Sequence, residues 1–226
     1  MDVQTLLKSK MDDASWQRLA AIDNADVNAF IAKAIELCEP ETVWVGDDSP
    51  EAAAYCRQLA IDNKEELPLA IEGHTVHFDS YFDQARKKEV TKYLVPQDET
   101  LDPKLNQVER DEGLAEIEKL QRGAYKGRQM LVRFFCLGPV DSIFAIPCLQ
   151  ITDSAYVCHS EDMLYRPGYE EFKRQSAKGG FEFFRFRHCT GEVTERMTCK
   201  HPELNRVYMD HTQNTVYSVN TQYAGN

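Results

Sequence analysis

Three residues near the end of the sequence, Tyr223, Ala224 and Gly225, stand where a loop could bind an anion. They follow Val216–Val219, a β-branched and aromatic run typical of a strand. Small side chains leave backbone N–H groups accessible, and such groups after a strand commonly hold a phosphate or a carboxylate. An ordinary turn or a frayed tail has the same composition. The pattern therefore leaves an anion site and a plain turn as alternatives.

Arg86 is a second residue that could contact an acidic ligand. Its guanidinium group can bind a carboxylate with two parallel hydrogen bonds. It lies in the segment Y-F-D-Q-A-R-K-K, however, and basic residues in such a segment usually form a solvated face. On spacing alone, a solvated side chain is the favoured interpretation of Arg86.

The segment G-H-T-V-H-F-D suggests a metal site formed by His74, His77 and Asp79. On a strand, residues three apart face opposite sides, so hydrogen-bonded or solvated histidines are the favoured interpretation. The acidic loop at Asp47 and Asp48 precedes a predicted helix, where carboxylates more often cap the helix than bind a metal. We therefore predict no metal ligand in this chain.

The first part of the sequence predicts a helix, a strand and a second helix. Asn24 or Asp26 can cap the first helix, whose apolar residues recur at three- and four-residue spacings until Pro40. The apolar run 42–45 predicts a strand. Ser49 is a predicted N-cap, followed by Pro50 at the first helical position.

Residues 63–126 are polar and irregular, with an amphipathic helix near 109–120, and we expect them to pack on the same core because no linker-like tract appears. The remainder is rich in β-branched and aromatic residues. Its predicted strands are 130–137, 144–151, 155–159 and 181–188, with a helix at 169–176 and a hairpin of 206–210 with 215–219. The predicted fold class is α/β, with a mixed, strand-rich sheet and flanking helices.

Composition excludes several kinds of partner. The 226 residues include 37 acidic and 26 basic side chains, for a formal charge of -11, and they contain no basic patch with interleaved aromatic residues. Nucleic acid is therefore an unsuitable partner, because binding it requires clustered basic residues. We find no apolar signal core and no run long enough to cross a membrane, so a cytoplasmic protein without a membrane partner is expected. Seven irregularly spaced cysteines predict reduced, mostly buried thiols.

Six segments in order resemble the amino-terminal part of phosphoenolpyruvate carboxykinases, in particular the archaeal and bacterial branch of the GTP-dependent type. They are L-C-E-P-E from Leu37, G-H-T-V-H-F-D-S-Y-F-D-Q-A-R from Gly73, R-D-E-G-L from Arg110, F-F-C-L-G-P from Phe134, L-Q-I-T-D-S-A-Y-V-C-H-S-E-D-M-L-Y-R-P-G-Y-E-E-F-K from Leu149, and S-V-N-T-Q-Y-A-G-N from Ser218. The resemblance spans residues 37–226 and is far more specific than any single motif.

The resemblance implies a reaction in which oxaloacetate and GTP yield phosphoenolpyruvate, GDP and carbon dioxide, with Mn²⁺ or Mg²⁺. Arg86 matches the family arginine that holds the substrate carboxylate, and Tyr223, Ala224 and Gly225 match the family Tyr-Gly-Gly segment that contacts substrate or product. Ala224 departs from this pattern, since alanine disfavours backbone angles that glycine permits. Altered affinity is one possible consequence.

The family's lysine pair, metal ligands, phosphate-binding loop and guanine pocket have no counterpart in this sequence. The expectation is that residues 1–226 form an amino-terminal substrate-binding domain, and that the carboxy-terminal domain binding nucleotide and metal is absent from the chain. By itself the chain is then expected to hold no catalytic residue and no cofactor, and to be inactive. A diphosphate-dependent carboxykinase and a stand-alone, non-enzymatic carboxylate-binding domain remain alternatives.

Overall fold

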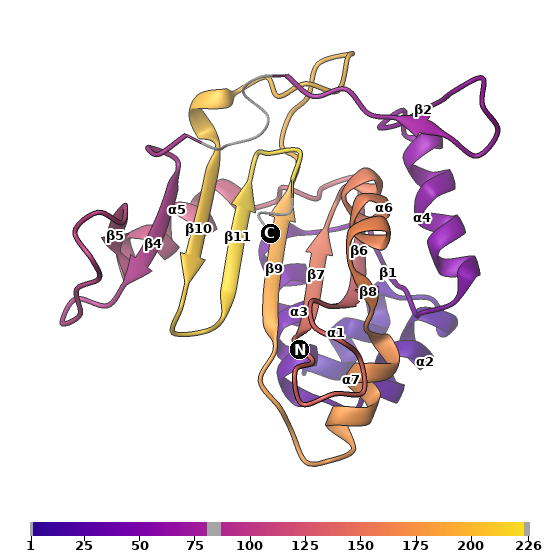
Figure 1. The fold of residues 1–226 in the computed structure, drawn as a ribbon, viewed down its shortest axis with the longest axis horizontal. Helices are drawn as coiled ribbons and strands as arrows, with labels where there is room; N and C mark the ends of the chain where they lie inside the picture. The colour runs from indigo at the N-terminus through magenta and orange to yellow at the C-terminus, as the bar shows by residue number, and fades with distance from the viewer. Residues whose placement is uncertain (1, 81–86, 224–226) are drawn as a thin grey trace.

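The computed structural model describes residues 2–80 and 87–223, which fold around one large mixed sheet (Figure 1). The helices are α1 (Val3–Lys10), α2 (Asp13–Ile22), α3 (Ala25–Cys38), α4 (Pro50–Asp62), α5 (Arg110–Gln121), α6 (Ala155–Leu164) and α7 (Tyr169–Ser176), with a short 3-10 helix at Pro202–Leu204. The strands are β1 (Thr42–Val45), β2 (Leu67–Pro68), β3 (Thr75–Val76), β4 (Thr91–Val95), β5 (Gln107–Glu109), β6 (Gln129–Cys136), β7 (Pro147–Thr152), β8 (Arg166–Pro167), β9 (Phe184–Cys189), β10 (Arg206–Asp210) and β11 (Thr215–Val219).

The large sheet has the order β1-β6-β7-β9-β11-β10-β4-β5, and β8 pairs with β6. Its centre is parallel, because β9 pairs in parallel with both β7 and β11. The pairs β6–β7 and β10–β11 are antiparallel, so the sheet is mixed, as the sequence predicted. Strands β4 and β5 extend this same sheet, and β2 pairs with β3 in a separate hairpin.

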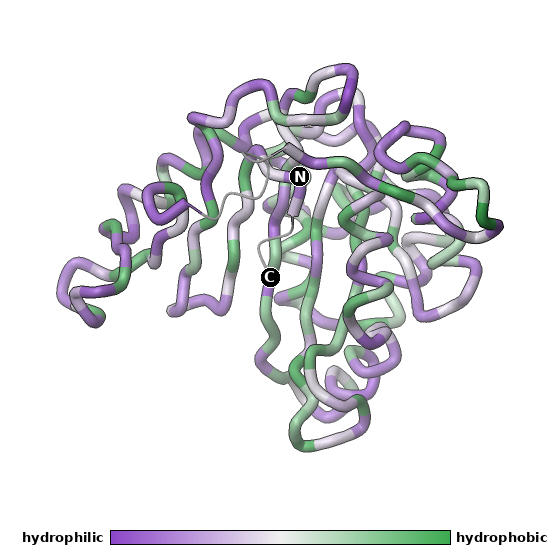
Figure 2. Tube along the Cα trace, turned by 45° about the horizontal axis from the view of Figure 1, so that its top comes forward, coloured by the Kyte–Doolittle hydropathy of each residue, from purple (hydrophilic) through white to green (hydrophobic). Residues whose placement is uncertain are grey.

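Alternating side chains place two apolar layers on the two faces of the sheet. Val43 and Val45 of β1 join the main core with α1, α2, α3 and residues of α5 and α7. Trp44, between them, joins a second cluster that includes residues of α4 and α6. The sheet is therefore covered on both faces, with α3 behind it and α6 in front of it in Figure 1. Figure 2 shows hydrophobic segments gathered in the central strands and hydrophilic ones along many rim loops.

Several predicted elements are confirmed at their capping residues. The side chain of Asn24 accepts hydrogen bonds from the backbone N–H groups of Asp26 and Val27 and begins α3. Ser49 caps α4, with Pro50 in its first turn. The hairpin of β10 and β11 has the predicted bounds. Helices α1 and α2 and strands β4 and β5 were not predicted from the sequence.

One predicted element is wrong: residues 155–159 form the first half of α6 and not a strand. Ser154 caps this helix by accepting a hydrogen bond from the Val157 N–H at 3.1 Å. The Glu65 carboxylate accepts a further bond from the Tyr156 N–H at 2.9 Å. Because most of the segment is buried, its short apolar run lacked the periodicity that separates a buried helix from a buried strand.

The acidic loop after β1 caps a helix that is distant in the sequence. Asp48 accepts hydrogen bonds from the N–H groups of Tyr169 and Glu170, both at 2.9 Å. Gly168 begins α7 without a side-chain cap of its own. The prediction that the acidic loop caps the helix that follows it is therefore wrong for Asp48, because Ser49 caps α4 and Asp48 caps α7.

We expect Asp48→Ala to lower the free energy of unfolding by about 1 kcal/mol, because two N–H groups of α7 lose their acceptor. Asp48→Asn keeps one carbonyl acceptor, so its free energy of unfolding should fall by less. Urea denaturation measures both changes, and Asp98→Ala, an exposed carboxylate in the β4–β5 loop, is the matched control. Equal losses in Asp48→Ala and Asp98→Ala would show that Asp48 does not stabilise α7.

Candidate functional site at the carboxyl ends of the central strands

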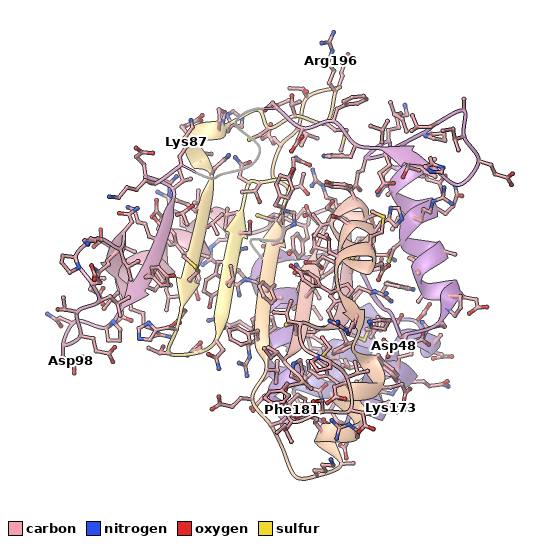
Figure 3. All side chains as sticks on the ribbon, in the orientation of Figure 1. Asp48, Lys87, Asp98, Lys173, Phe181 and Arg196 are labelled. Carbon is pink, nitrogen blue, oxygen red and sulfur yellow. The ribbon has the colours of Figure 1, made fainter. Side chains whose placement is uncertain are left out.

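The three central parallel strands end at the same edge of the sheet, and their following loops form the candidate site. These loops begin at Asp153 after β7, at Thr190 after β9 and at Asn220 after β11. In open α/β sheets, ligands bind outside the carboxyl ends of the strands. Strand β4 starts at this edge, since it runs parallel to β10 and opposite to β11. In Figure 3, Lys87 and Arg196 lie at this end of the sheet, and Phe181 lies at the other.

Asn220 turns the chain out of β11 toward the predicted anion-binding loop. Its backbone is left-handed, with φ of 58°. Its side-chain amide donates to the carbonyl oxygen of His201 at 2.6 Å and to Oδ1 of Asn205 at 2.9 Å. A Cβ atom on Gly191 would stand 1.9 Å from Oδ1 of Asn220, and Gly191 also has a φ of +73°. Glycine at position 191 is therefore required for this turn.

The described part of that loop ends at Tyr223, which is fixed at both its backbone and its side chain. The Tyr223 carbonyl oxygen accepts hydrogen bonds from Oγ of Ser218 at 2.7 Å and Oγ1 of Thr221 at 2.8 Å. The phenol donates a hydrogen bond to the carboxylate of Asp79. Of the four predicted substrate-binding residues, Arg86, Ala224 and Gly225 lie outside the described residues.

His188 of β9 is fully buried and joins the ends of all three parallel strands. Its Nε2 lies 2.9 Å from the carbonyl oxygen of Thr221, and its Nδ1 lies 2.7 Å from Oγ1 of Thr152. A carbonyl oxygen only accepts, so Nε2 carries the proton and Nδ1 accepts from the Thr152 hydroxyl. Burial lowers the pKa of His188, because it disfavours the charged imidazolium. A neutral histidine is thus fixed in one tautomer beneath the loop.

A cavity of about 400 Å³ lies beside this edge, and Tyr223 is not among its lining residues. Its polar wall includes Arg128, whose guanidinium group pairs with Asp153 at 2.6 Å and donates to the Gly191 carbonyl oxygen at 3.1 Å. Asp153 also accepts from the Thr190 N–H at 2.9 Å. The Thr190 hydroxyl oxygen is buried and has no hydrogen-bond partner. These residues were not predicted from the sequence, because they lie far apart in the chain.

The two histidines of the G-H-T-V-H-F-D segment make separate backbone contacts. Nδ1 of His77 lies 2.6 Å from the carbonyl oxygen of Glu65, and its ring stacks on Tyr156. Nδ1 of His74 lies 3.1 Å from the carbonyl oxygen of Glu72. Over residues 2–80 and 87–223, no group of three or more histidine, cysteine, aspartate or glutamate residues is arranged to hold a metal ion.

Two further predictions concern the state of the cysteine thiols and the presence of membrane-spanning helices. All seven cysteines are free thiols; six are buried and Cys199 is half-buried. None of the helices in the described ranges is both long and apolar enough to cross a membrane.

A mixed sheet covered by helices on both faces defines an α/β domain. The chain matches the family model for the phosphoenolpyruvate carboxykinase N-terminal domain over residues 29–226, and it belongs to this family. A relative from Thermococcus sibiricus, named phosphoenolpyruvate carboxykinase (GTP), is 47% identical over 226 residues, which is 100% of this chain and 36% of the relative.

Two further relatives carry the same name. One from Thermococcus kodakarensis is 48% identical over 226 residues, again 100% of this chain and 36% of the relative. One from Pyrococcus abyssi is 48% identical over 220 residues, or 97% of this chain and 35% of the relative. The chain therefore spans about a third of the length of these curated relatives.

We expect His188 to make stability depend on pH. Its pKa is lower in the folded state than in the unfolded chain, so its contribution is complete above the unfolded pKa of about 6.5 and falls as pH drops below it. His188→Gln should remove this part of the dependence of stability on pH below about pH 6.5. It should also destabilise the fold, since one buried hydrogen-bond partner is lost. Denaturation at several pH values measures both effects.

His211→Gln, at an exposed position in the β10–β11 turn that faces Glu99, is measured over the same pH range as a second histidine substitution. An unchanged slope in His188→Gln would contradict the account of a neutral, buried His188.

Proposed function

We propose that this chain is the substrate-binding part of a GTP-dependent phosphoenolpyruvate carboxykinase, which converts oxaloacetate and GTP to phosphoenolpyruvate, GDP and carbon dioxide. The observation that carries the proposal is the match of all 226 residues to relatives with that name. These names favour GTP over diphosphate as the phosphoryl donor. In the reaction, loss of carbon dioxide from oxaloacetate leaves an enolate, whose oxygen then takes the terminal phosphoryl group of GTP.

Within this chain, we propose that Arg86, Tyr223, Ala224 and Gly225 bind the substrate. The guanidinium group of Arg86 suits a carboxylate, and accessible N–H groups at Ala224 and Gly225 suit an anion. The position of Tyr223 at the carboxyl ends of the central strands supports this assignment. So does the start of β4 at the same edge, five residues after Arg86 in the sequence.

The part of the reaction assigned to this chain is binding and orientation. Holding a dicarboxylate in one geometry removes much of the entropic cost of the later steps. Family resemblance implies Mn²⁺ or Mg²⁺, but the described residues do not fit such an ion, and no step is assigned to a metal on them. We propose that the metal and GTP bind in the part of the longer enzyme that corresponds to the rest of the relatives' length.

The first test is calorimetric titration of the chain with oxalate, a dicarboxylate that stands in for the enolate. We expect binding without added metal, weakened about tenfold or more by Arg86→Ala, because a charge-assisted hydrogen bond contributes about 1.5–3 kcal/mol. Arg196→Ala, an exposed arginine at the same end of the sheet, should bind as the wild type does. Oxalate binding that is insensitive to Arg86→Ala would refute the assignment of this residue.

The second test is an activity assay of the chain with oxaloacetate, GTP and Mn²⁺. We expect no phosphoenolpyruvate, because the proposed binding residues supply neither a nucleotide site nor a metal site. The product is measured by a coupled enzymatic assay, with a full-length carboxykinase as the positive control. Turnover by the purified chain that disappears in Arg86→Ala would show that the chain is catalytic by itself.

A further inference from the structure

The cavity of about 400 Å³ beside the candidate site has walls from three separate parts of the chain. Leu59, Asn63 and Glu65 come from the end of α4 and the residues that follow it. A second part is the turn before β6 with the first residues of that strand, and the third part is the pair of loops after β7 and β9. The volume lies in the usual range for pockets that hold small organic molecules.

Two buried carboxylates hold the polar side of this cavity in place. Asp153 accepts hydrogen bonds from Arg128 at 2.6 Å and from the Thr190 N–H at 2.9 Å. One oxygen of Glu65 accepts from the side-chain amide of Asn63 at 3.0 Å, and the other accepts from groups at the start of α6. All four carboxylate oxygens therefore already accept hydrogen bonds from the protein. The polar walls are ordered before any ligand arrives, which favours binding.

The hydroxyl group of Thr190 is the part of the wall that lacks a partner. Thr190 is 4% exposed, and its hydroxyl oxygen is buried without a hydrogen-bond partner among the described residues. A threonine hydroxyl can donate one hydrogen bond and accept two, and leaving it unpaired in the interior is unfavourable. Because Thr190 lines the cavity, a molecule inside the cavity can supply the missing partner.

The charges around the cavity select against an anion. The described lining residues include the carboxylates of Glu65 and Asp153 and one basic side chain, Arg128. The guanidinium group of Arg128 pairs with Asp153, so its charge is already balanced within the wall. An anion in the cavity would be repelled by the carboxylate of Glu65. A neutral molecule therefore suits this cavity better than a phosphate or a dicarboxylate.

The remaining walls suit a flat ring. Four apolar side chains also line the cavity, namely Leu59, Leu131, Val193 and Met197. They favour a molecule with apolar faces. The planar guanidinium group of Arg128 can in addition stack on an aromatic ring. Nucleobases have such a ring face together with hydrogen-bonding groups along the ring edge.

We propose that this cavity binds a neutral, flat nitrogen heterocycle, a free purine or pyrimidine base. In this proposal the Thr190 hydroxyl makes a hydrogen bond to the edge of the ring, and the guanidinium group of Arg128 lies against its face. Tyr223 does not line the cavity, so the inference does not depend on the proposed dicarboxylate site.

The first test is calorimetric titration of the chain with adenine and with uracil, which are both uncharged near neutral pH. We expect at least one of them to bind the wild type, and Thr190→Val, which keeps the shape of the side chain, to bind it about tenfold more weakly. Thr100→Val, at an exposed position in the β4–β5 loop, is the matched control and should bind as the wild type does. Failure of both bases to bind the wild type, or equal binding by Thr190→Val, would overturn the inference.

Urea denaturation without ligand examines the unpaired hydroxyl by itself. We expect Thr190→Val to keep or raise the midpoint of unfolding, because it removes a polar group that lacks a partner. A lower midpoint in Thr190→Val than in the wild type would show that the hydroxyl is already satisfied in the free protein. That result would overturn the role assigned to Thr190.

Competition with oxalate tests the charge argument. We expect excess oxalate to leave the bound base in place, because the carboxylates of the cavity disfavour an anion there. Displacement of the base by oxalate would show that the two molecules share one site, and would overturn the assignment of this cavity to a neutral ligand.

Discussion

The candidate site depends on one buried imidazole. His188 extends from the central strand β9 and makes hydrogen bonds to Thr152 at the end of β7 and to Thr221 after β11. Because the ring is fully buried, each of its nitrogens needs a partner, and the two partners come from the two neighbouring strands. This requirement fixes where the three parallel strands end relative to one another at this edge of the sheet. The loop that leads to Tyr223 starts from this edge.

Beyond this edge, the loop runs from the buried Asn220 to the half-buried Tyr223. Asn220 and Gly191 form a turn in which a larger residue at 191 would collide with the asparagine side chain. Tyr223, at the end of the described loop, is half-buried. Its carbonyl oxygen accepts hydrogen bonds from Ser218 and Thr221, and its phenol donates one to Asp79. A rigid base that carries a loop with a few defined contacts is the usual design of a ligand site on an α/β sheet.

Local signals in the sequence predicted much of this fold. Asn24, Ser49 and Pro50 have capping preferences that depend only on neighbouring residues, so α3 and α4 could be placed from the sequence. The hairpin of β10 and β11 was predicted from an equally local signal, the short segment of four residues between the two strands. Residues 155–159 were misassigned because burial on several sides hides the helical period, and because part of their support comes from Glu65, about 90 residues earlier.

The site itself was only partly predictable. The motif resemblance drew attention to Tyr223, whereas nothing in the local sequence distinguishes Asp79 as its partner or pairs Arg128 with Asp153. These contacts join residues on different loops, and they become visible only when the strand order is known. Asp48 illustrates the same limit: its tendency to cap a helix was evident, but the identity of that helix followed from tertiary packing.

We propose that a dicarboxylate binds against the Tyr223 loop rather than in the cavity lined by Arg128, Asp153 and Thr190. A crystal structure of the chain with oxalate tests this most directly. We expect oxalate beside the backbone of residues 223–225 and the guanidinium group of Arg86, with the Tyr223–Asp79 hydrogen bond intact. Oxalate bound instead to Arg128 and Thr190, with the Tyr223 loop free of ligand, would contradict it.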